Sequence, residues 1–222
     1  MSISTGDISI LGRIADASNA TLLGEISGKK VVYKPVAGER PLWDFPDGNL
    51  AQREFAAYLV SELLEFGIVP PTYLRDGPYG LGMVQEWIEA DEEIDIVELS
   101  QSNNVCVRKI ALFDILINNG DRKFGHLLAT SQSMIYGIDH GVTFNSENKL
   151  RTVLWQWVGE DFTTEELGHI KHFLDNFPTP EIRELLTQEE IKATITRAKT
   201  LYETGTFPEP SQDWPAVPWP PF

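Results

Sequence analysis

The most constraining feature of the sequence is a change of hydrophobic pattern near residue 88. Before this point, short apolar runs are separated by Gly, Pro, Asn and Asp, which is typical of short strands joined by tight turns. After it, apolar residues recur mainly at helical spacing, which predicts amphipathic helices. A chain that has strands first and helices afterwards belongs to the α+β class. We therefore expect a β-rich N-terminal lobe followed by a mostly helical lobe.

These patterns predict individual elements and three regions. The expected strands lie at 8–14, 21–26, 31–35, 72–75, 82–88 and 134–141. The expected helices lie at 49–66, 104–118, 163–176 and 188–203. We interpret residues 1–88 as the first lobe, 89–206 as the helical lobe and 207–222 as a proline-rich tail. The acidic run at 91–98 is expected to be a solvated connector, and the tail either packs through its two tryptophans or stays free.

Composition limits the class of protein. With 222 residues, 42% of them apolar, the chain can bury the core of one large domain or of two small lobes. It contains neither an uncharged apolar run of bilayer length nor a basic segment followed by a hydrophobic stretch at its N-terminus, so we expect a cytoplasmic protein without stable membrane association. Its single cysteine, Cys106, excludes an intramolecular disulfide.

The net charge of −15 argues against a nucleic-acid partner. A polyanionic substrate would therefore need a local cationic pocket or bound metal ions.

Two loop carboxylates are the strongest candidates for chemistry. Asp121 follows an apolar helix in the stretch DILINNGDRKFGH, and Asp139 follows an apolar strand in the stretch IDHG. Two carboxylates in loops on either side of a strand pair can converge on one cleft. Metal-assisted phosphoryl transfer needs such a pair, since one carboxylate orients or deprotonates the acceptor hydroxyl and the other holds a divalent ion against the phosphates.

The pair NNGDRKFGH and IDHG resembles the catalytic and metal-binding loops of the phosphatidylinositol 3-/4-kinases and the HipA-like kinases. With YKPVAGERPLWDFPDG and KLRTVLW, the chain is similar to a family of small actinobacterial proteins that resemble those kinases and have no assigned substrate. The resemblance implies a protein-kinase-like bilobal fold with a reduced C-lobe, and it implies use of ATP with Mg²⁺ or Mn²⁺. It makes Asp121 the catalytic residue and Asp139 a metal ligand.

The chain departs from the kinase pattern at His126, where those kinases place a metal-binding Asn. Imidazole suits Mn²⁺ better than the hard ion Mg²⁺, so His126 is either a second metal ligand or a structural residue. At the next departure, Lys123 stands where the lipid kinases have His.

A kinase also requires a strand lysine for the phosphates and a helical glutamate to position it. VVYKP supplies Lys34 and REFAAYL supplies Glu54, whereas Lys30 abuts a turn and is the poorer candidate. Glu39 competes with Glu54, and we favour Glu54 because a helix fixes its position.

Two further segments complete the predicted nucleotide site. The turn between the first two strands offers Ser18, Asn19 and Thr21 as donors to phosphate. The end of the last strand in the first lobe offers the backbone of residues around Gln85, Glu86 and Trp87 to adenine.

Three functions from different classes fit these residues. The favoured one is an ATP-dependent kinase that phosphorylates a hydroxyl on a protein or small polar molecule. The second is a nucleotide-binding pseudokinase that acts as a regulatory module. The third is a metal-dependent phosphohydrolase built from His126, Asp139 and His140, which would leave Lys34 and Glu54 without a role. The acceptor is not identified by residues 146–222.

Overall fold

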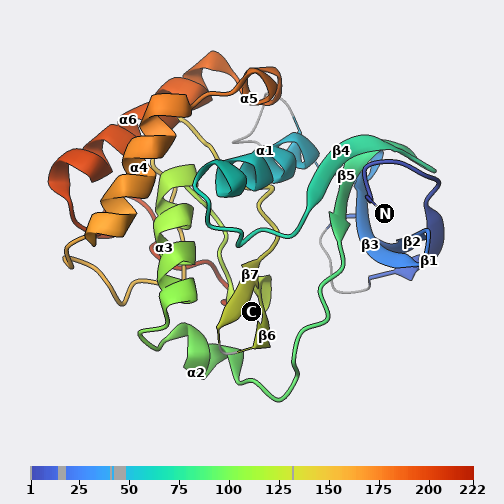
Figure 1. Ribbon diagram of the computed structural model, residues 1–222, viewed down its shortest axis with the longest axis horizontal. Coiled ribbons are helices and arrows are strands. Elements are labelled where there is room, and N and C mark those ends of the chain that lie inside the picture. The colour runs from blue at the N-terminus through green and yellow to red at the C-terminus, as the bar shows by residue number, and fades with distance from the viewer. Residues whose placement is uncertain (1, 15–18, 41, 43–48, 132) are drawn as a thin grey trace.

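The computed structural model describes residues 2–14, 19–40, 42, 49–131 and 133–222. A five-stranded sheet forms one end of the molecule and a group of helices forms the other, with one helix between them (Figure 1). The strands are β1 (Ser9–Arg13), β2 (Leu22–Ile26), β3 (Lys29–Pro35), β4 (Thr72–Gly77), β5 (Gly80–Glu86), β6 (Leu127–Ser131) and β7 (Met134–Gly137). The α-helices are α1 (Leu50–Leu63), α2 (Ile96–Ser100), α3 (Val105–Ile117), α4 (Thr164–Asn176), α5 (Pro180–Leu185) and α6 (Gln188–Thr204).

The larger sheet has the order β1-β2-β3-β5-β4, and its neighbouring strands run antiparallel. The β2–β3 turn is Ser27-Gly28, in which both residues have positive φ (51° and 84°), as a tight hairpin turn demands. Alternate residues of the central strands, including Val31, Tyr33 and Val84, form a small apolar core on one face. This core is separate from the core of the helical lobe.

The helical lobe is built around α3, which is buried along most of its length. Helix α1 contributes Ala56, Ala57 and Val60 to the helical core while it also packs against β4 and β5, so it connects the two lobes. Its N-terminus is fixed by a capping box, in which the Asn49 side chain accepts from Gln52 N and the Gln52 side chain accepts from Asn49 N. The domain boundary near residue 88 stays a prediction.

The predicted fold class is confirmed, and the helices and strands expected from periodicity are present. Two short α-helices and one strand were not predicted: α2, α5 and β6. Helix α2 begins inside the acidic run at 91–98, because the Asp95 side chain accepts from Val97 N and Glu98 N and caps it. Strand β6 follows the 3-10 turn Phe124–His126 directly and pairs with β7. Over the described residues, no helix has both the length and the apolar character needed to cross a bilayer.

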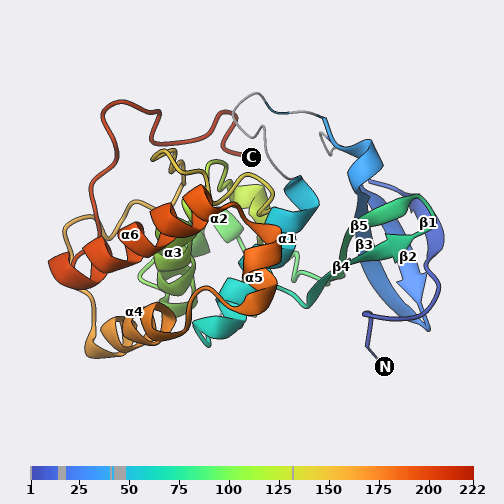
Figure 2. The same cartoon turned by 90° about the horizontal axis from the view of Figure 1, so that it is seen from above.

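The proline-rich tail does not hang free. It returns across the helical lobe toward the middle of the molecule (Figure 2). Phe124 N donates to Pro221 O at 2.9 Å, and the rings of Phe124 and Phe222 lie 5.4 Å apart. Of the two tail tryptophans, Trp219 is 89% exposed, whereas Trp214 is partly buried against the body. The tail therefore packs against the loop that contains Asp121.

Candidate active site

A cavity of about 430 Å³ lies where β3, the N-terminus of α1 and the two predicted loops meet. Lys34, Glu54, Asp121 and Asp139 all line it, so four of the residues predicted from sequence share one space. The rest of the described lining consists of Asn19, Ala20, Pro35, Glu39, Arg40, Leu42, Leu50, Ala51, Gly141, Val142, Arg151 and Trp214.

The central contact of the cavity is made by Lys34. Its Nζ lies 2.7 Å from Glu54 Oε1 and 2.8 Å from Asp139 Oδ1, so a strand, a helix and a loop are joined by one ammonium group. Burial alone would lower the pKa of Lys34, but the carboxylates of Asp139 and Glu54 outweigh it and raise this pKa above its ordinary value. Lys34 is therefore fully charged at neutral pH.

The two carboxylates that contact Lys34 have pKa values shifted in opposite directions. Glu54 is only 2% exposed, and its burial raises its pKa. The charge of Lys34 lowers the pKa of the half-exposed Asp139 far below the usual carboxyl range. Glu54 Oε2 also accepts a hydrogen bond from His140 N at 2.8 Å, so the same helix residue fixes the loop that follows β7. Residue 139 itself has a positive φ of 60°, which turns its side chain into the cavity.

Glu39, the alternative partner for the lysine, has a different position. Its two carboxylate oxygens accept from Leu50 N and Ala51 N, each at 2.9 Å. These N–H groups have no intrahelical partners, because they open α1. Glu39 therefore stabilises the start of the helix that carries Glu54.

The loop with Asp121 is held by polar residues that sequence reasoning missed. Arg122 is fully buried and forms a two-pronged ion pair with Asp114, with Nε to Oδ2 at 2.8 Å and Nη2 to Oδ1 at 2.9 Å. Asn119 donates to Asp114 Oδ1 and accepts from Asp121 N. Helix α3 ends at Asn118 in the left-handed conformation (φ 53°), which directs the chain out of the helix. These contacts fix the backbone on both sides of Asp121.

Arg122 also ties this loop to the loop of Asp139. Its Nη1 donates to the carbonyls of His126 and Ile138, and its Nη2 lies 2.7 Å from His140 Nε2. Because a guanidinium only donates, His140 Nε2 is the acceptor and the neutral ring carries its proton on Nδ1. Burial, reinforced by the charge of Arg122, holds the pKa of His140 well below its ordinary value. An Asp inside the apolar helix pattern, with Arg eight residues later, was the available signal for this network.

The two predicted metal residues lie near each other. His126 Nε2 is 3.4 Å from Asp139 Oδ2, and burial lowers the pKa of His126. In the part of the chain that the structure describes, no group of three or more His, Cys, Asp or Glu side chains is placed to hold a metal. The predicted set of His126, Asp139 and His140 does not form, because His140 is buried and bonded to Arg122.

The predicted phosphate turn is only partly in the cavity. Ser18 lies outside the described residues. Asn19 lines the cavity and its Oδ1 accepts from Arg40 N at 2.9 Å. Thr21 is 5% exposed and its hydroxyl donates to Asn19 O at 3.4 Å, so it supports the turn from behind.

The predicted adenine segment lies outside the described lining of this cavity. The side chain of Gln85 is buried and donates to Thr72 Oγ1 at 2.8 Å. The backbone N–H groups of Glu86 and Trp87 donate to Pro71 O and Lys30 O. These two N–H groups are therefore already engaged within the protein.

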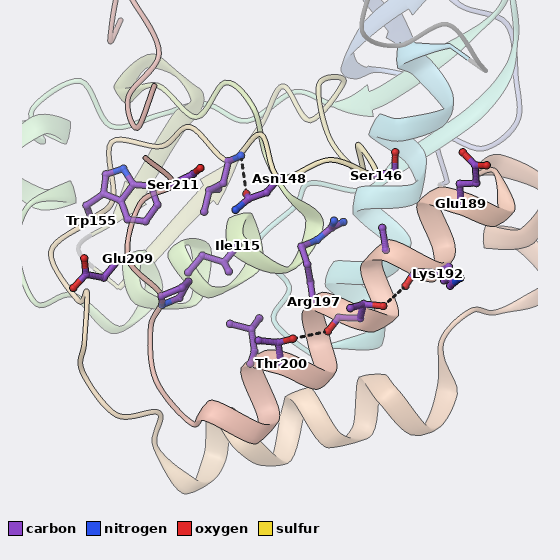
Figure 3. Close-up of a pocket in the computed structure, with 15 residues that line it drawn as sticks. Ile115, Ser146, Asn148, Trp155, Glu189, Lys192, Arg197, Thr200, Glu209 and Ser211 are labelled. Carbon is purple, nitrogen blue, oxygen red and sulfur yellow. Dashed lines mark hydrogen bonds between the residues drawn. The ribbon is translucent and has the colours of Figure 1, made fainter. Parts of the chain in front are cut away.

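A second cavity, of about 550 Å³, lies away from these residues between α6 and the start of the tail (Figure 3). Arg197 projects from α6 at this cavity and donates to Leu116 O and Asn145 O, and burial lowers its pKa to about 10. These carbonyls satisfy its guanidinium, which stabilises the packing of α6 against the end of α3. None of the site residues predicted from sequence lines this cavity.

Comparison with known proteins places the fold and the family. The chain superposes on a crystal structure of the Golgi casein kinase with a TM-score of 0.57, at 14% identity, covering 90% of this chain and 71% of that one. It superposes on the Helicobacter pylori proinflammatory kinase CtkA with a TM-score of 0.53, at 10% identity, covering 91% and 93% of the two chains. These likenesses show a kinase-like fold.

At the level of sequence, no family model matches the chain. The sequence is, however, 38% identical to protein Rv2133c of Mycobacterium tuberculosis, and the match covers 99% of this chain and 94% of that protein. The chain therefore belongs to the family of protein Rv2133c.

Proposed function

We propose that the protein is an ATP-dependent phosphotransferase that transfers the terminal phosphoryl group of ATP to a hydroxyl group of a protein or small polar molecule. The observation that carries the proposal is the position of Lys34 Nζ, between Glu54 Oε1 at 2.7 Å and Asp139 Oδ1 at 2.8 Å, in a cavity that Asp121 also lines. Kinases require a lysine and glutamate pair of this kind beside the metal-binding aspartate. The kinase-like fold of the chain supports the same conclusion.

Each residue has a distinct role in this proposal. Lys34 binds phosphate oxygens, and Glu54 holds its ammonium group in place. Asp121, whose side chain is 31% exposed, accepts the proton of the acceptor hydroxyl. As the acceptor oxygen bonds to phosphorus, the bond from phosphorus to the bridging oxygen breaks and ADP leaves with that electron pair. Lys123 Nζ lies 3.5 Å from Asp121 Oδ2, so an ammonium group faces this carboxylate from the same loop.

The residues present fit a divalent ion bound together with a nucleotide. Mg²⁺ is commonly held by one or two protein carboxylates while phosphate oxygens and water complete its shell, so a three-residue protein cluster is not needed. Asp139 would hold Mg²⁺ or Mn²⁺, with His126 as the second protein ligand for Mn²⁺. When bound, the ion would neutralise charge that develops on the phosphates.

One observation favours the second candidate, a nucleotide-binding pseudokinase. Both carboxylate oxygens of Asp139 already face protein cations or a ring nitrogen, with Oδ1 at 2.8 Å from Lys34 and Oδ2 at 3.4 Å from His126. These contacts compete with a metal ion for the same carboxylate. A module that keeps the nucleotide and does no chemistry would leave them in place.

The experiment that separates the two candidates measures ATP binding and ATP consumption on the same preparation. The purified protein is titrated with ATP by calorimetry, and is then incubated with radiolabelled ATP and either Mg²⁺ or Mn²⁺. A phosphotransferase binds ATP and produces ADP and a labelled product. Binding without turnover with either metal would establish the pseudokinase, and the absence of binding would refute both. A Lys34→Met variant serves as the binding-deficient control.

A further inference from the structure

The segment 149–155, KLRTVLW, is not one of the predicted kinase loops. In the structure it lies beside the loop of Asp121. Arg151 N donates to Asn119 O at 2.9 Å and Arg122 N donates to Arg151 O at 3.0 Å. Residues Arg122 and Thr152 form a parallel bridge. The segment therefore runs next to the proposed catalytic loop as a second layer, and Arg151 is carried to the wall of the cavity.

The side chain of Arg151 has donors to spare. Its Nε donates to Gly120 O at 2.7 Å, directly before Asp121, which fixes the guanidinium beside the proposed base. No described residue forms a hydrogen bond or ion pair with either of its terminal nitrogens. A guanidinium has five N–H donors in a planar fork, so four remain available. A fork of this geometry matches a carboxylate or phosphate group, which accepts two parallel hydrogen bonds.

The tail supplies the second part of this wall. The ring of Trp214 lies 5.6 Å from Arg151 Cζ and 5.1 Å from Lys149 Nζ. The tail is fixed here because Ala216 O accepts from Thr152 N at 3.0 Å and from Trp155 Nε1 at 2.9 Å. The cavity thus has an aromatic side chain next to the free fork of Arg151.

We propose that Arg151 and Trp214 form the acceptor subsite of the cavity, and that they bind a hydroxyl compound that carries a carboxylate close to its hydroxyl group. This inference rests on the proposed phosphotransfer function. The fork of Arg151 binds the carboxylate, and the ring of Trp214 packs against the rest of the acceptor. Arg151 Nε donates to Gly120 O, directly before Asp121. An acceptor held by Arg151 would therefore have its hydroxyl group next to the carboxylate of Asp121. Arg151 and Lys149, which both lie beside the Trp214 ring, favour an anionic acceptor over a neutral one at this wall of the cavity.

Two kinds of acceptor carry a carboxylate close to a hydroxyl group: an acidic peptide and a small hydroxy acid. The test includes both. One probe pair is a serine peptide flanked by glutamates and the same peptide flanked by glutamines. The other pair is glycerate and its uncharged amide. Arginine-selective labelling with a dicarbonyl reagent, read out by mass spectrometry of the full chain, reports protection of Arg151 without any catalytic turnover. Arg183, an exposed arginine on α5, is the matched control for labelling.

The expected result is that the carboxylate member of at least one pair protects Arg151 from labelling, whereas its uncharged analogue does not, and that Arg183 is unaffected. Protection by ATP alone would assign Arg151 to the nucleotide and overturn the proposal, as would the absence of protection by any probe. Because protection does not need transfer, it can succeed even if the phosphotransferase assay fails, so the two failures are distinguishable.

Variants extend the test to kinetics with whichever carboxylate probe is phosphorylated. Arg151→Gln should raise the acceptor KM by about 10- to 100-fold while the dissociation constant for ATP stays the same, because a charge-assisted hydrogen bond is lost. Arg151→Lys should recover only part of this loss, because it restores charge without the fork. Trp214→Leu keeps an apolar side chain and removes the aromatic ring, so it tests the contribution of that ring to the subsite. An unchanged acceptor KM in both Arg151→Gln and Trp214→Leu would refute the subsite.

Discussion

Replacing Asp114 with alanine is expected to lower the free energy of unfolding substantially, although Asp114 is not among the residues that line the cavity. The substitution removes both prongs of the buried ion pair with Arg122, at 2.8 and 2.9 Å, and leaves the guanidinium in a fully buried position. Breaking a buried pair by removal of one partner costs about 3–5 kcal/mol. Arg122 keeps its bonds to the carbonyls of His126 and Ile138, so we expect the lower end, about 3 kcal/mol.

Equilibrium unfolding in urea measures this cost. A chain of this size has a urea slope of roughly 3 kcal/mol per molar, so a loss of about 3 kcal/mol lowers the midpoint by about 1 M. The matched control is Asp175→Ala, which breaks an ion pair with Lys171 at the same distance of 2.8 Å but with side chains 58% and 60% exposed. This exposed helical pair should contribute only about 0.3–0.5 kcal/mol.

A double variant separates the cost of an unpaired charge from the value of the pair. Arg122→Met combined with Asp114→Leu removes both charges, so it should cost less than the sum of the two single substitutions. Equal midpoints for Asp114→Ala and Asp175→Ala would refute the reasoning, because burial of Arg122 would then have no energetic consequence.

Three further predictions concern the loops around the cavity. Because burial and Arg122 hold the pKa of His140 well below 6.5, this residue gains a proton only on unfolding. Its contribution to stability is complete above about pH 6.5 and declines as the pH falls below that value. The urea midpoint should therefore be lower at about pH 5.5 than at pH 7.5, and a flat profile would contradict this prediction. His126→Asn should shift the metal preference of ATP turnover from Mn²⁺ toward Mg²⁺, and an unchanged ratio of the two rates would show that His126 binds no metal. Gly38→Ala places a methyl group 2.5 Å from the Cβ atom of Ala20, which lines the cavity. This clash should lower the unfolding free energy by about 1–3 kcal/mol and weaken ATP binding. The control is Gly125→Ala, where the added methyl group meets open space.

Sequence reasoning succeeded where the signal is local and periodic. The strands of the sheet and helices α1, α3, α4 and α6 follow directly from apolar spacing and capping residues. It also anticipated that Lys34 and Glu54 would meet, because their order and element types follow the kinase pattern, and they form an ion pair at 2.7 Å. The roles of these residues in nucleotide binding and catalysis stay predictions.

What the sequence did not reveal depends on contacts between distant segments. Nothing local to Arg151 or Trp214 indicates that the tail returns to the wall of the cavity, since their proximity depends on the hydrogen bonds of Ala216. The capping role of Glu39 could not be predicted from sequence either, because this residue caps α1 from outside the usual capping positions. Strand β6 was missed because it follows the turn Phe124–His126 directly and begins with two adjacent apolar residues in place of an alternating pattern.

The most direct test of the phosphotransfer site is the single-turnover rate of phosphoryl transfer at saturating ATP for the parent protein and for Asp121→Asn. The substitution keeps the shape of the side chain and removes its ability to accept a proton. We predict that the rate falls by about 10²- to 10⁴-fold while the dissociation constant for ATP is unchanged. Asp175→Asn, on the exposed face of α4, should match the parent in both quantities. An Asp121→Asn protein as active as the parent would contradict the proposed site.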